Sequence, residues 1–189
     1  MTIGILAVQG AFLEHEQMLK KLGIDYVELR QKSDLKKSFQ GLILPGGEST
    51  VQGKLLKELD MFDSLKEMIK AGLPVLATCA GMILLAENLS NDDKRYFQTM
   101  PITVKRNAYG RQLGSFHTVA KFKAIGEIPM TFIRAPYVEE YASSIEVLSV
   151  VNEKTVAVKY GNQIALAFHP ELDTDTQIYQ KFISLIENR

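Results

Sequence analysis

The first half of this 189-residue chain alternates short apolar runs with amphipathic segments. Residues 2–8, 25–29 and 41–44 have the composition of buried strands, whereas residues 12–22 and 61–71 repeat apolar side chains at helical spacing. This alternation favours a mostly parallel sheet covered by helices on both faces. Because such sheets carry their active sites at the carboxyl ends of strands, reactive residues are expected directly after the apolar runs.

Cys79, the only cysteine, lies at such a position. An apolar run at residues 73–77 passes through Thr78-Cys79-Ala80-Gly81 into a second apolar segment at residues 82–86, which indicates a strand, a tight turn and a helix. That elbow would lift the thiol above the sheet edge, where the N–H groups of the new helix favour a thiolate. The sequence predicts a nucleophile here, although a lone cysteine also occurs as inert core filler.

A second apolar run, residues 165–168, ends in His169-Pro170-Glu171. The spacing would bring a base and an orienting carboxylate out of one strand end, as acyl transfer by a thiol requires. Taken alone, His169 could be a hydrogen-bonded core histidine and Glu171 the start of a loop.

A glycine pair follows the strand at residues 41–44, in Pro45-Gly46-Gly47-Glu48-Ser49. Glycines let backbone N–H groups approach a substrate closely, and such donors stabilise the oxyanion of a tetrahedral intermediate. We expect the N–H groups of Gly47 and Ala80 to form this oxyanion hole. An ordinary turn is the alternative interpretation.

The middle of the chain is rich in short strands, expected at residues 102–105, 118–122, 131–133, 146–151 and 155–160, and residues 176–187 form a closing helix. They predict a small antiparallel β section within a single domain spanning residues 1–189. Lysine plus arginine and aspartate plus glutamate number 22 each, so no net field attracts nucleic acid or an anionic membrane. A lone cysteine and a short, unflanked N-terminal apolar run favour a cytoplasmic protein, and no histidine or cysteine cluster has metal-ligand spacing.

Together, the Pro45–Ser49, Thr78–Gly81 and His169–Glu171 motifs resemble those of the class I, triad-type glutamine amidotransferases. Further matches resemble the glutaminase subunits of pyridoxal 5′-phosphate synthases: Gln9-Gly10, Arg106-Asn107, Gly110-Arg111-Gln112 and Phe132-Ile133-Arg134-Ala135-Pro136. The resemblance covers essentially the whole chain. Two departures are Ala77, where the family usually has glycine, and Ala108-Tyr109, which replaces a common Ser-Phe pair.

The resemblance implies a flavodoxin-like α/β sandwich that hydrolyses L-glutamine to L-glutamate and ammonia without a cofactor. It implies Cys79 as nucleophile, His169 as base and Glu171 as its partner. The ammonia would pass to a separate (β/α)8-barrel synthase subunit in a large hetero-oligomer that makes vitamin B6. Glutamine contacts carried over from the family are Gly46, Gly47, Glu48, Arg106, Ile133 and Arg134.

Arg106 and Arg134 are each expected on a strand among apolar neighbours, where a guanidinium needs a carboxylate partner from substrate or protein. The partner interface is expected around Gln9, Gly10, Ala11, Glu14 and His15, because the end of the first strand shares a sheet edge with Cys79. For His15 a solvated helix position is the leading interpretation and contact with the partner the alternative. His117 is interpreted as a surface or sheet residue.

Two other function classes remain open at this point. A thiol hydrolase or deglycase of the same topology would also place a cysteine at an elbow, but it would need neither the glycine-pair loop nor the His-Pro-Glu strand end. A non-catalytic binding module would carry a thiol that does not react with electrophilic glutamine analogues.

Overall fold

The parallel strands expected in the first half of the chain form the centre of the molecule. The computed structural model describes residues 1–107 and 114–188. Its strands are β1 (Thr2–Leu6), β2 (Asp25–Leu29), β3 (Gly41–Leu44), β4 (Val75–Thr78), β5 (Ala86–Leu89), β6 (Met100–Lys105), β7 (Ser115–Phe122), β8 (Gly126–Ile133), β9 (Tyr137–Tyr141), β10 (Glu146–Val151), β11 (Lys154–Tyr160) and β12 (Gln163–Leu166). Its helices are α1 (Phe12–Lys21), α2 (Ser49–Glu58), α3 (Phe62–Lys70), α4 (Ala80–Leu85) and α5 (Gln177–Glu187), with 3-10 turns η1 (Lys32–Lys36) and η2 (Pro170–Leu172).

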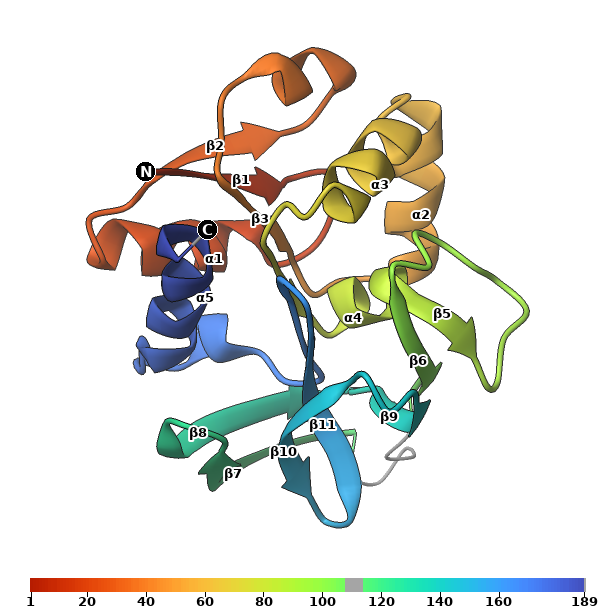
Figure 1. Ribbon diagram of the computed structural model, residues 1–189, viewed down its shortest axis with the longest axis vertical. Helices are drawn as coiled ribbons and strands as arrows, with labels where there is room; N and C mark the ends of the chain where they lie inside the picture. Colours follow the sequence, from red (N-terminus) through yellow and green to blue (C-terminus); the bar gives the residue numbers. More distant parts are fainter. Residues whose placement is uncertain (108–113, 189) are drawn as a thin grey trace.

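Within the described residues, ten strands form one sheet in the order β2-β1-β3-β4-β12-β11-β9-β6-β5, with β10 paired to β11. The strands from β2 to β12 in this order run parallel, whereas β11 is antiparallel to β9, β10 and β12. Helices α1 and α5 cover one face, and α2, α3 and α4 cover the other (Figure 1). The predicted three-layer, flavodoxin-like α/β fold is confirmed.

Strand register brings the three motif-bearing strand ends together. Leu44 of β3 lies beside Ala77 of β4, and Leu166 of β12 lies beside Thr78. Every residue of β3, β4 and β12 is buried, which explains why these strands are apolar except for Thr78 at the end of β4 and Gln163 at the start of β12. The glycine-pair loop, Cys79 and His169 therefore leave the sheet at one edge, called here the carboxyl edge.

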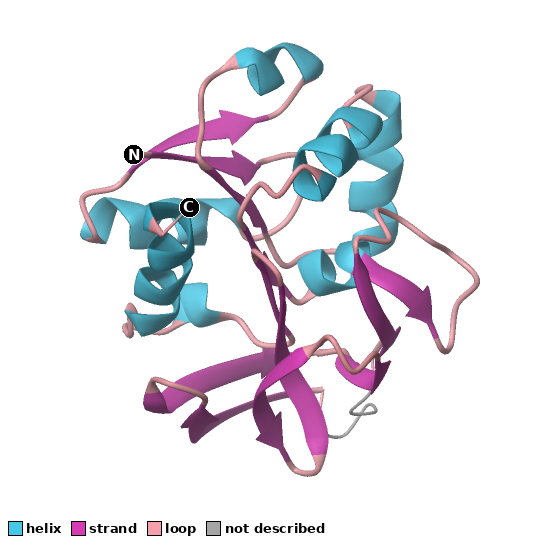
Figure 2. Ribbon diagram, in the orientation of Figure 1, coloured by secondary structure: helices cyan, strands magenta, loops and turns pink. Residues whose placement is uncertain are grey.

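The β-rich middle section is also present, in two parts (Figure 2). Strands β6, β9, β10 and β11 extend the main sheet, while β7 and β8 pair antiparallel as a separate two-stranded sheet. Phe132 on β8 stacks on Phe116 at a ring-centroid distance of 4.5 Å and contacts Phe168 at 5.7 Å. These aromatic contacts attach the hairpin to the segment that carries His169.

Among the helices and strands of the described residues, three were not expected from the sequence, namely α2, β5 and β9. The buried face of α2 consists of Ser49, Gln52, Gly53 and Leu56, so it lacks an apolar helical repeat. The apolar segment after Cys79 was expected to stay helical to residue 86, but α4 ends at Leu85 and Ala86 begins β5. The strand expected at residues 165–168 lies two residues earlier, as β12.

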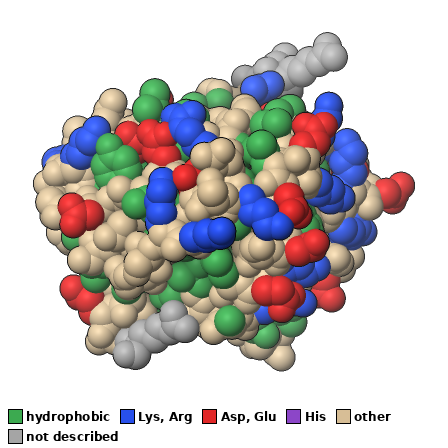
Figure 3. Space-filling view, turned by 90° about the horizontal axis from the view of Figure 1, so that it is seen from above, with side chains coloured by type: hydrophobic (Ala, Val, Ile, Leu, Met, Phe, Trp, Pro, Cys, Tyr) green, Lys and Arg blue, Asp and Glu red, His purple; other side chains and the backbone are tan. Residues whose placement is uncertain are grey.

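The surface has no single-sign charged face in the view of Figure 3, where basic and acidic side chains are interspersed. This distribution agrees with equal numbers of acidic and basic residues in the sequence. Among the described residues, no helix is both long and apolar enough to span a lipid bilayer.

Candidate active site

Cys79 occupies a sharp turn between β4 and α4. Its φ of +47° and ψ of −100° are unusual for a residue with a side chain, and its N–H donates to the carbonyl oxygen of Leu166 at 2.7 Å. Backbone strain of this kind concentrates at functional sites, and the strand-turn-helix context is that of a nucleophile elbow. Ala77, the departure noted in the sequence, is a fully buried strand residue between Leu44 and Ala165, so its methyl group fits.

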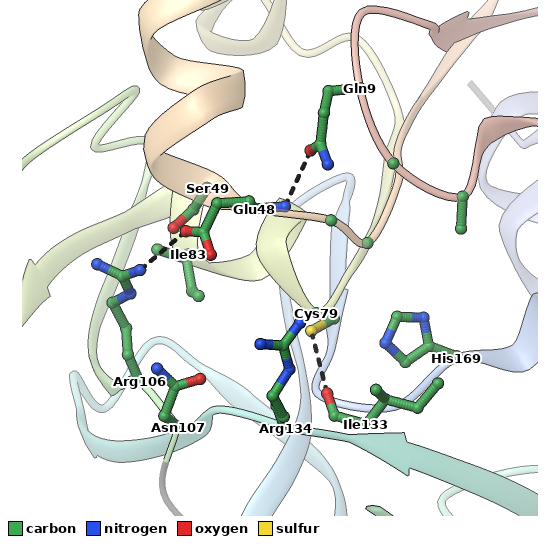
Figure 4. Close-up of a pocket in the computed structure, with 14 residues that line it drawn as sticks. Gln9, Glu48, Ser49, Cys79, Ile83, Arg106, Asn107, Ile133, Arg134 and His169 are labelled. Atoms are coloured by element: carbon green, nitrogen blue, oxygen red, sulfur yellow. Dashed lines mark hydrogen bonds and ion pairs between the residues drawn. The ribbon is translucent and has the colours of Figure 1, made fainter. Parts of the chain in front are cut away.

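His169 lies beside Cys79 at the pocket (Figure 4). Its ring is held by Glu171. The Nδ1 atom of His169 is 2.7 Å from Oε1 of Glu171, and both residues are 6% exposed. Burial alone would lower the pKa of His169, but hydrogen bonds to Cys79 and Glu171 raise it to about 10. Since Nδ1 is engaged by the carboxylate, Nε2 is the nitrogen available to Cys79.

Glu171 remains ionised although it is buried. Burial alone would raise the pKa of this carboxyl, but the hydrogen bond and the positive charge of His169 help to hold it below its ordinary value. An ionised carboxylate fixes the imidazole tautomer and stabilises the imidazolium. The predicted nucleophile, base and orienting carboxylate thus lie in one connected arrangement.

The glycine-pair loop packs directly against this arrangement. The N–H of Gly46 donates to Oγ1 of Thr78 at 2.9 Å, and its carbonyl accepts from the N–H of Ala11 at 2.9 Å. A Cβ on Gly46 would lie 2.3 Å from Cε1 of His169, so this position requires glycine. Because a trans peptide directs its C=O and N–H oppositely, the N–H of Gly47 points away from Ala11.

A pocket of about 260 Å³ opens above these groups. Its volume is slightly below the usual range of roughly 300–1,000 Å³ for ligand sites, which suits a substrate of amino-acid size. Its lining includes Cys79, His169 and every residue expected to contact substrate, namely Gly46, Gly47, Glu48, Arg106, Ile133 and Arg134. Ala80, the other expected oxyanion donor, is buried at the first position of α4.

Arg106 has the carboxylate partners that its setting requires. Its Nη2 is 3.0 Å from Oε1 of Glu48, and its Nη1 is 2.5 Å from Oδ2 of Asp92. The expectation that it lies on a strand is wrong, because β6 ends at Lys105. Asn91 explains why the strand ends before Arg106. The side chain of Asn91 accepts from the N–H of Arg106 and donates to the carbonyl of Arg106, and these hydrogen bonds take the place of strand pairing.

Arg134 also lies one residue beyond its expected strand, β8, with a positive φ of +43°. Its N–H donates to the carbonyl of Gly114, and its exposed side chain extends into the pocket (Figure 4). The preceding carbonyl, that of Ile133, is 4.0 Å from Sγ of Cys79. The segment therefore brings both main chain and a cation to the nucleophile.

The loop at Gln9–Ala11, which is expected to contact a partner, is hydrogen-bonded to the glycine-pair loop. Oε1 of Gln9 accepts from the N–H of Glu48 at 2.9 Å, and Nε2 of Gln52 donates to the carbonyls of Gln9 and Pro45 at 3.0 and 3.1 Å. Gly10 has a φ of +106°, and a Cβ there would lie 2.0 Å from the carbonyl oxygen of Gly46. Gln9, Gly10 and Ala11 also line the pocket, while Glu14 is half-buried on α1.

The interpretation of His15 as a solvated helix residue is wrong, because its side chain is completely buried. The reason is that α1 packs its inner face on the sheet, where His15 meets Thr78, Glu171 and Tyr179. His117 is exposed on β7, as expected, and its Nδ1 is 3.1 Å from Oγ1 of Thr131.

Sequence reasoning missed the supporting roles of Thr78, Gln52 and Asp92, since isolated polar residues carry no periodic signal. The one available hint was that Thr78 directly precedes the nucleophile. The Gly110-Arg111-Gln112 motif and Ala108-Tyr109 lie outside the described residues. Within those residues no group of three or more histidine, cysteine or acidic side chains could hold a metal ion.

The chain matches known proteins over nearly its full length. It is 61% identical to "Pyridoxal 5'-phosphate synthase subunit PdxT" of Desulfitobacterium hafniense (strain DSM 10664 / DCB-2), covering 98% of this chain and 94% of that protein. It is 50% identical to the protein of the same name from Haemophilus influenzae (strain PittGG), covering 98% of each. A solved structure described as "Crystal structure of glutamine amidotransferase" superposes with a TM-score of 0.92 at 36% identity, covering 98% of each chain.

A family model agrees with these relatives and with the geometry. It is described as the SNO glutamine amidotransferase family, and it matches residues 5–188. That range includes the elbow, the glycine-pair loop and the His-Pro-Glu strand end. With its cysteine, histidine and glutamate gathered at the carboxyl edge, this chain belongs to the SNO glutamine amidotransferase family.

Proposed function

We propose that this chain is the glutaminase subunit of a pyridoxal 5′-phosphate synthase. It hydrolyses L-glutamine to L-glutamate and supplies the ammonia for vitamin B6 synthesis. The observation that carries this proposal is the junction of Cys79, the His169–Glu171 pair and the Gly46-Gly47 loop around one pocket of amino-acid size. Full-length relatives named as subunits of that synthase support the specific assignment.

The reaction proceeds through a glutamyl thioester. The thiolate of Cys79 attacks the side-chain amide carbon of glutamine, forming a C–S bond and a tetrahedral oxyanion. The imidazolium of His169 gives its Nε2 proton to the leaving nitrogen, the C–N bond breaks, and ammonia departs. Water then attacks the thioester while His169 takes a proton, and the C–S bond breaks to release glutamate and the thiolate.

The oxyanion needs donors other than the triad. We assign this role to the N–H groups of Gly47 and Ala80, because both flank the thiol at the carboxyl edge. Each correctly aimed donor contributes about 3 kcal/mol to transition-state stabilisation. The Gly46–Gly47 peptide can rotate at low steric cost, so a change in its orientation could turn the Gly47 N–H toward or away from the oxyanion and thereby regulate the rate.

Substrate binding is assigned to the other residues that line the pocket. Glu48, next to the Arg106 guanidinium, suits the α-ammonium of glutamine, and Arg106 and Arg134 suit its α-carboxylate. Gly46 and Ile133 contribute backbone to the lining of the same pocket, and the carbonyl of Ile133 is 4.0 Å from Sγ of Cys79.

The test of the enzymatic function uses an electrophilic glutamine analogue, 6-diazo-5-oxo-L-norleucine. We expect it to label Cys79, located by mass spectrometry of peptides, and we expect free glutamine to protect the thiol. Labelling at Cys79 without glutamine protection would favour the thiol hydrolase alternative. An unreactive thiol in a folded chain would favour a non-catalytic binding module.

We further propose that a (β/α)8-barrel synthase subunit docks where β1 passes into α1, within a large hetero-oligomer, and activates hydrolysis. Gln9 and Ala11 form hydrogen bonds with the glycine-pair loop, at the N–H of Glu48 and the carbonyl of Gly46. A partner that moves Gln9 and Ala11 would therefore reorient the Gly46–Gly47 peptide. Leu13, on the first turn of α1, is 53% exposed and offers apolar contact area. His15 is buried and therefore lies behind this surface.

Docking is tested by measuring glutamine hydrolysis with and without the purified synthase subunit. We expect the subunit to raise turnover, and we expect Leu13→Asp to weaken the activation. Val150→Asp is the matched control, because Val150 on β10 is also 53% exposed. Equal turnover with and without the subunit would contradict activation, and equal effects of the two variants would move the interface elsewhere.

Two further proposals concern the domain organisation of the chain and its location in the cell. We propose that residues 1–189 act as one glutaminase domain, since residues from Gln9 to His169 line the same pocket. We place the protein in the cytoplasm, where a single free thiol such as Cys79 stays reduced.

A further inference from the structure

His15 is a fully buried polar side chain that the reaction above does not use. It lies on α1, and its Nδ1 is 2.7 Å from the hydroxyl oxygen of Tyr179 on α5. Its Nε2 is 3.3 Å from Oγ1 of Thr78 and 3.7 Å from Oε1 of Glu171. One imidazole thus connects two helices to the residue before the nucleophile and to the carboxylate of the triad.

The protonation of this cluster follows from its surroundings. Burial lowers the pKa of His15 despite the opposing effect of Glu171, so the imidazole is neutral and carries a single N–H. Burial and the nearby Glu171 raise the pKa of Tyr179, so its hydroxyl keeps its proton and donates to Nδ1. The N–H of His15 is then at Nε2, facing Thr78 and Glu171. The opposite tautomer would direct a lone pair at the carboxylate.

Thr78 extends this contact to the glycine-pair loop. Its Oγ1 accepts from the N–H of Gly46 at 2.9 Å, and Nε2 of His15 lies 3.3 Å from the same oxygen. The loop that carries the proposed oxyanion donor of Gly47 is therefore anchored to a hydroxyl that His15 holds. Oε1 of Glu171, which orients His169, is the other atom near the same N–H.

We propose that His15 is a positioning residue of the active site: its neutral Nε2–H form donates to the Thr78 hydroxyl and directs the same N–H dipole toward the Glu171 carboxylate, and so helps to align both the proposed catalytic imidazole and the glycine-pair loop. The role in catalysis rests on the proposed glutaminase function. The hydrogen-bonded arrangement itself does not, and it can be measured in the free chain.

The first test is ¹⁵N NMR of histidine side chains in the full-length chain across a pH titration. The sequence has three histidines, so single variants assign every ring. We expect His15 to stay neutral with its proton on Nε2, and we expect His15→Leu to move the titration of His169 to lower pH. A proton on Nδ1, a doubly protonated His15, or an unchanged His169 midpoint would overturn the proposal.

Tyr179→Phe provides a second variant should His15→Leu fail to fold. Removing the hydroxyl takes away the donor to Nδ1, so a fraction of His15 should change to the Nδ1–H tautomer, again visible by ¹⁵N NMR. An unchanged tautomer would overturn the role assigned to Tyr179 and to the network.

The second test is glutaminase kinetics in complex with the synthase subunit. His15→Leu should lower kcat about 10- to 100-fold, the effect typical of residues that orient a reactive group, with little change in KM. His15→Gln should recover most of this loss, because its amide N–H can occupy the place of Nε2–H. Leu19→Ala is the matched control: Leu19 is equally buried on α1 but lies outside the network.

These measurements separate the two proposals. Leu19→Ala should lower thermal stability while leaving kcat per folded enzyme and its pH profile unchanged, whereas His15→Leu should move the alkaline limb to lower pH. Parallel behaviour of the two variants, or a His15→Gln enzyme no better than His15→Leu, would overturn the positioning role. A wild-type complex without glutaminase activity would contradict the proposed function, and the NMR result would still decide the network.

Discussion

The carboxyl edge formed by β3, β4 and β12 and the β-rich section from β6 to β9 contribute to the same pocket by different means. At the carboxyl edge, Cys79 and His169 follow fully buried strands, and each is linked by hydrogen bonds to neighbouring strands. In the β-rich section, Arg106 and Arg134 lie just beyond strand ends, and Arg134 is exposed to solvent. The proposed reacting groups therefore follow packed parallel strands, and the cations proposed to bind substrate lie in loops.

This difference has a kinetic meaning. Acyl transfer depends on atoms held in near-attack geometry, and small misplacements cost large factors in rate. Binding of a charged substrate depends on charge and hydrogen bonding, which loops can provide. We therefore expect substitutions at the carboxyl edge to act on kcat and substitutions in the β-rich section to act on KM.

Cys79→Ser should have the largest effect. The hydroxyl is a far weaker nucleophile than the thiolate, so glutaminase turnover should fall by about 10⁴-fold or more in the synthase complex, with the fold intact by circular dichroism. Retention of more than a few per cent of wild-type turnover would mean that the nucleophile lies elsewhere.

Substitutions of the base and of its orienting carboxylate should have the next largest effect. His169→Ala and Glu171→Gln should both lower kcat, the histidine more, with a loss of about 10²–10⁴-fold for Glu171→Gln because the imidazole loses its tautomer control. Unchanged kinetics for Glu171→Gln would remove this residue from the triad and break the assignment of kcat to the carboxyl edge.

Arg106→Ala should act mainly on KM. A charge-assisted hydrogen bond contributes about 1.5–3 kcal/mol, so KM for glutamine should rise roughly 10- to 100-fold with a smaller change in kcat. Arg134→Ala should be milder if the main chain at Ile133-Arg134 makes the contact. Wild-type KM in both variants, measured by steady-state hydrolysis, would contradict the role given to the β-rich section.

The smallest effect concerns stability and pH. The pKa of His169 is raised from an ordinary 6.5 to about 10 by Cys79 and Glu171, so the folded state binds a proton that the unfolded state has lost between these values. The stabilisation is therefore fully present below about pH 6.5 and disappears as pH rises through about 10. Urea unfolding should show the advantage of wild type over His169→Gln shrinking across this range, while that over Leu19→Ala stays constant.

Much of the carboxyl edge was predictable because its signals are local. Apolar runs that contain or overlap β3, β4 and β12 indicate buried parallel strands; Cys79 directly follows β4, and His169 lies three residues beyond the end of β12. Parallel strands place their carboxyl ends together, so the meeting of these residues followed from topology alone. Helix α2 and strand β9 were missed because their buried faces carry too few apolar residues to produce a period.

The sequence by itself determined the fold class and singled out Cys79, His169, Glu171 and the glycine pair as candidate site residues, because periodicity and turn residues are local properties of the chain. Only the tertiary structure decided which isolated polar residues support them. The side chain of Thr78 contacts both Gly46 and His15, and the side chain of Asp92 contacts Arg106. The paired residues are between 14 and 63 positions apart in the sequence. Hydrogen bonds and burial depend on distances between elements, and linear spacing does not encode those distances.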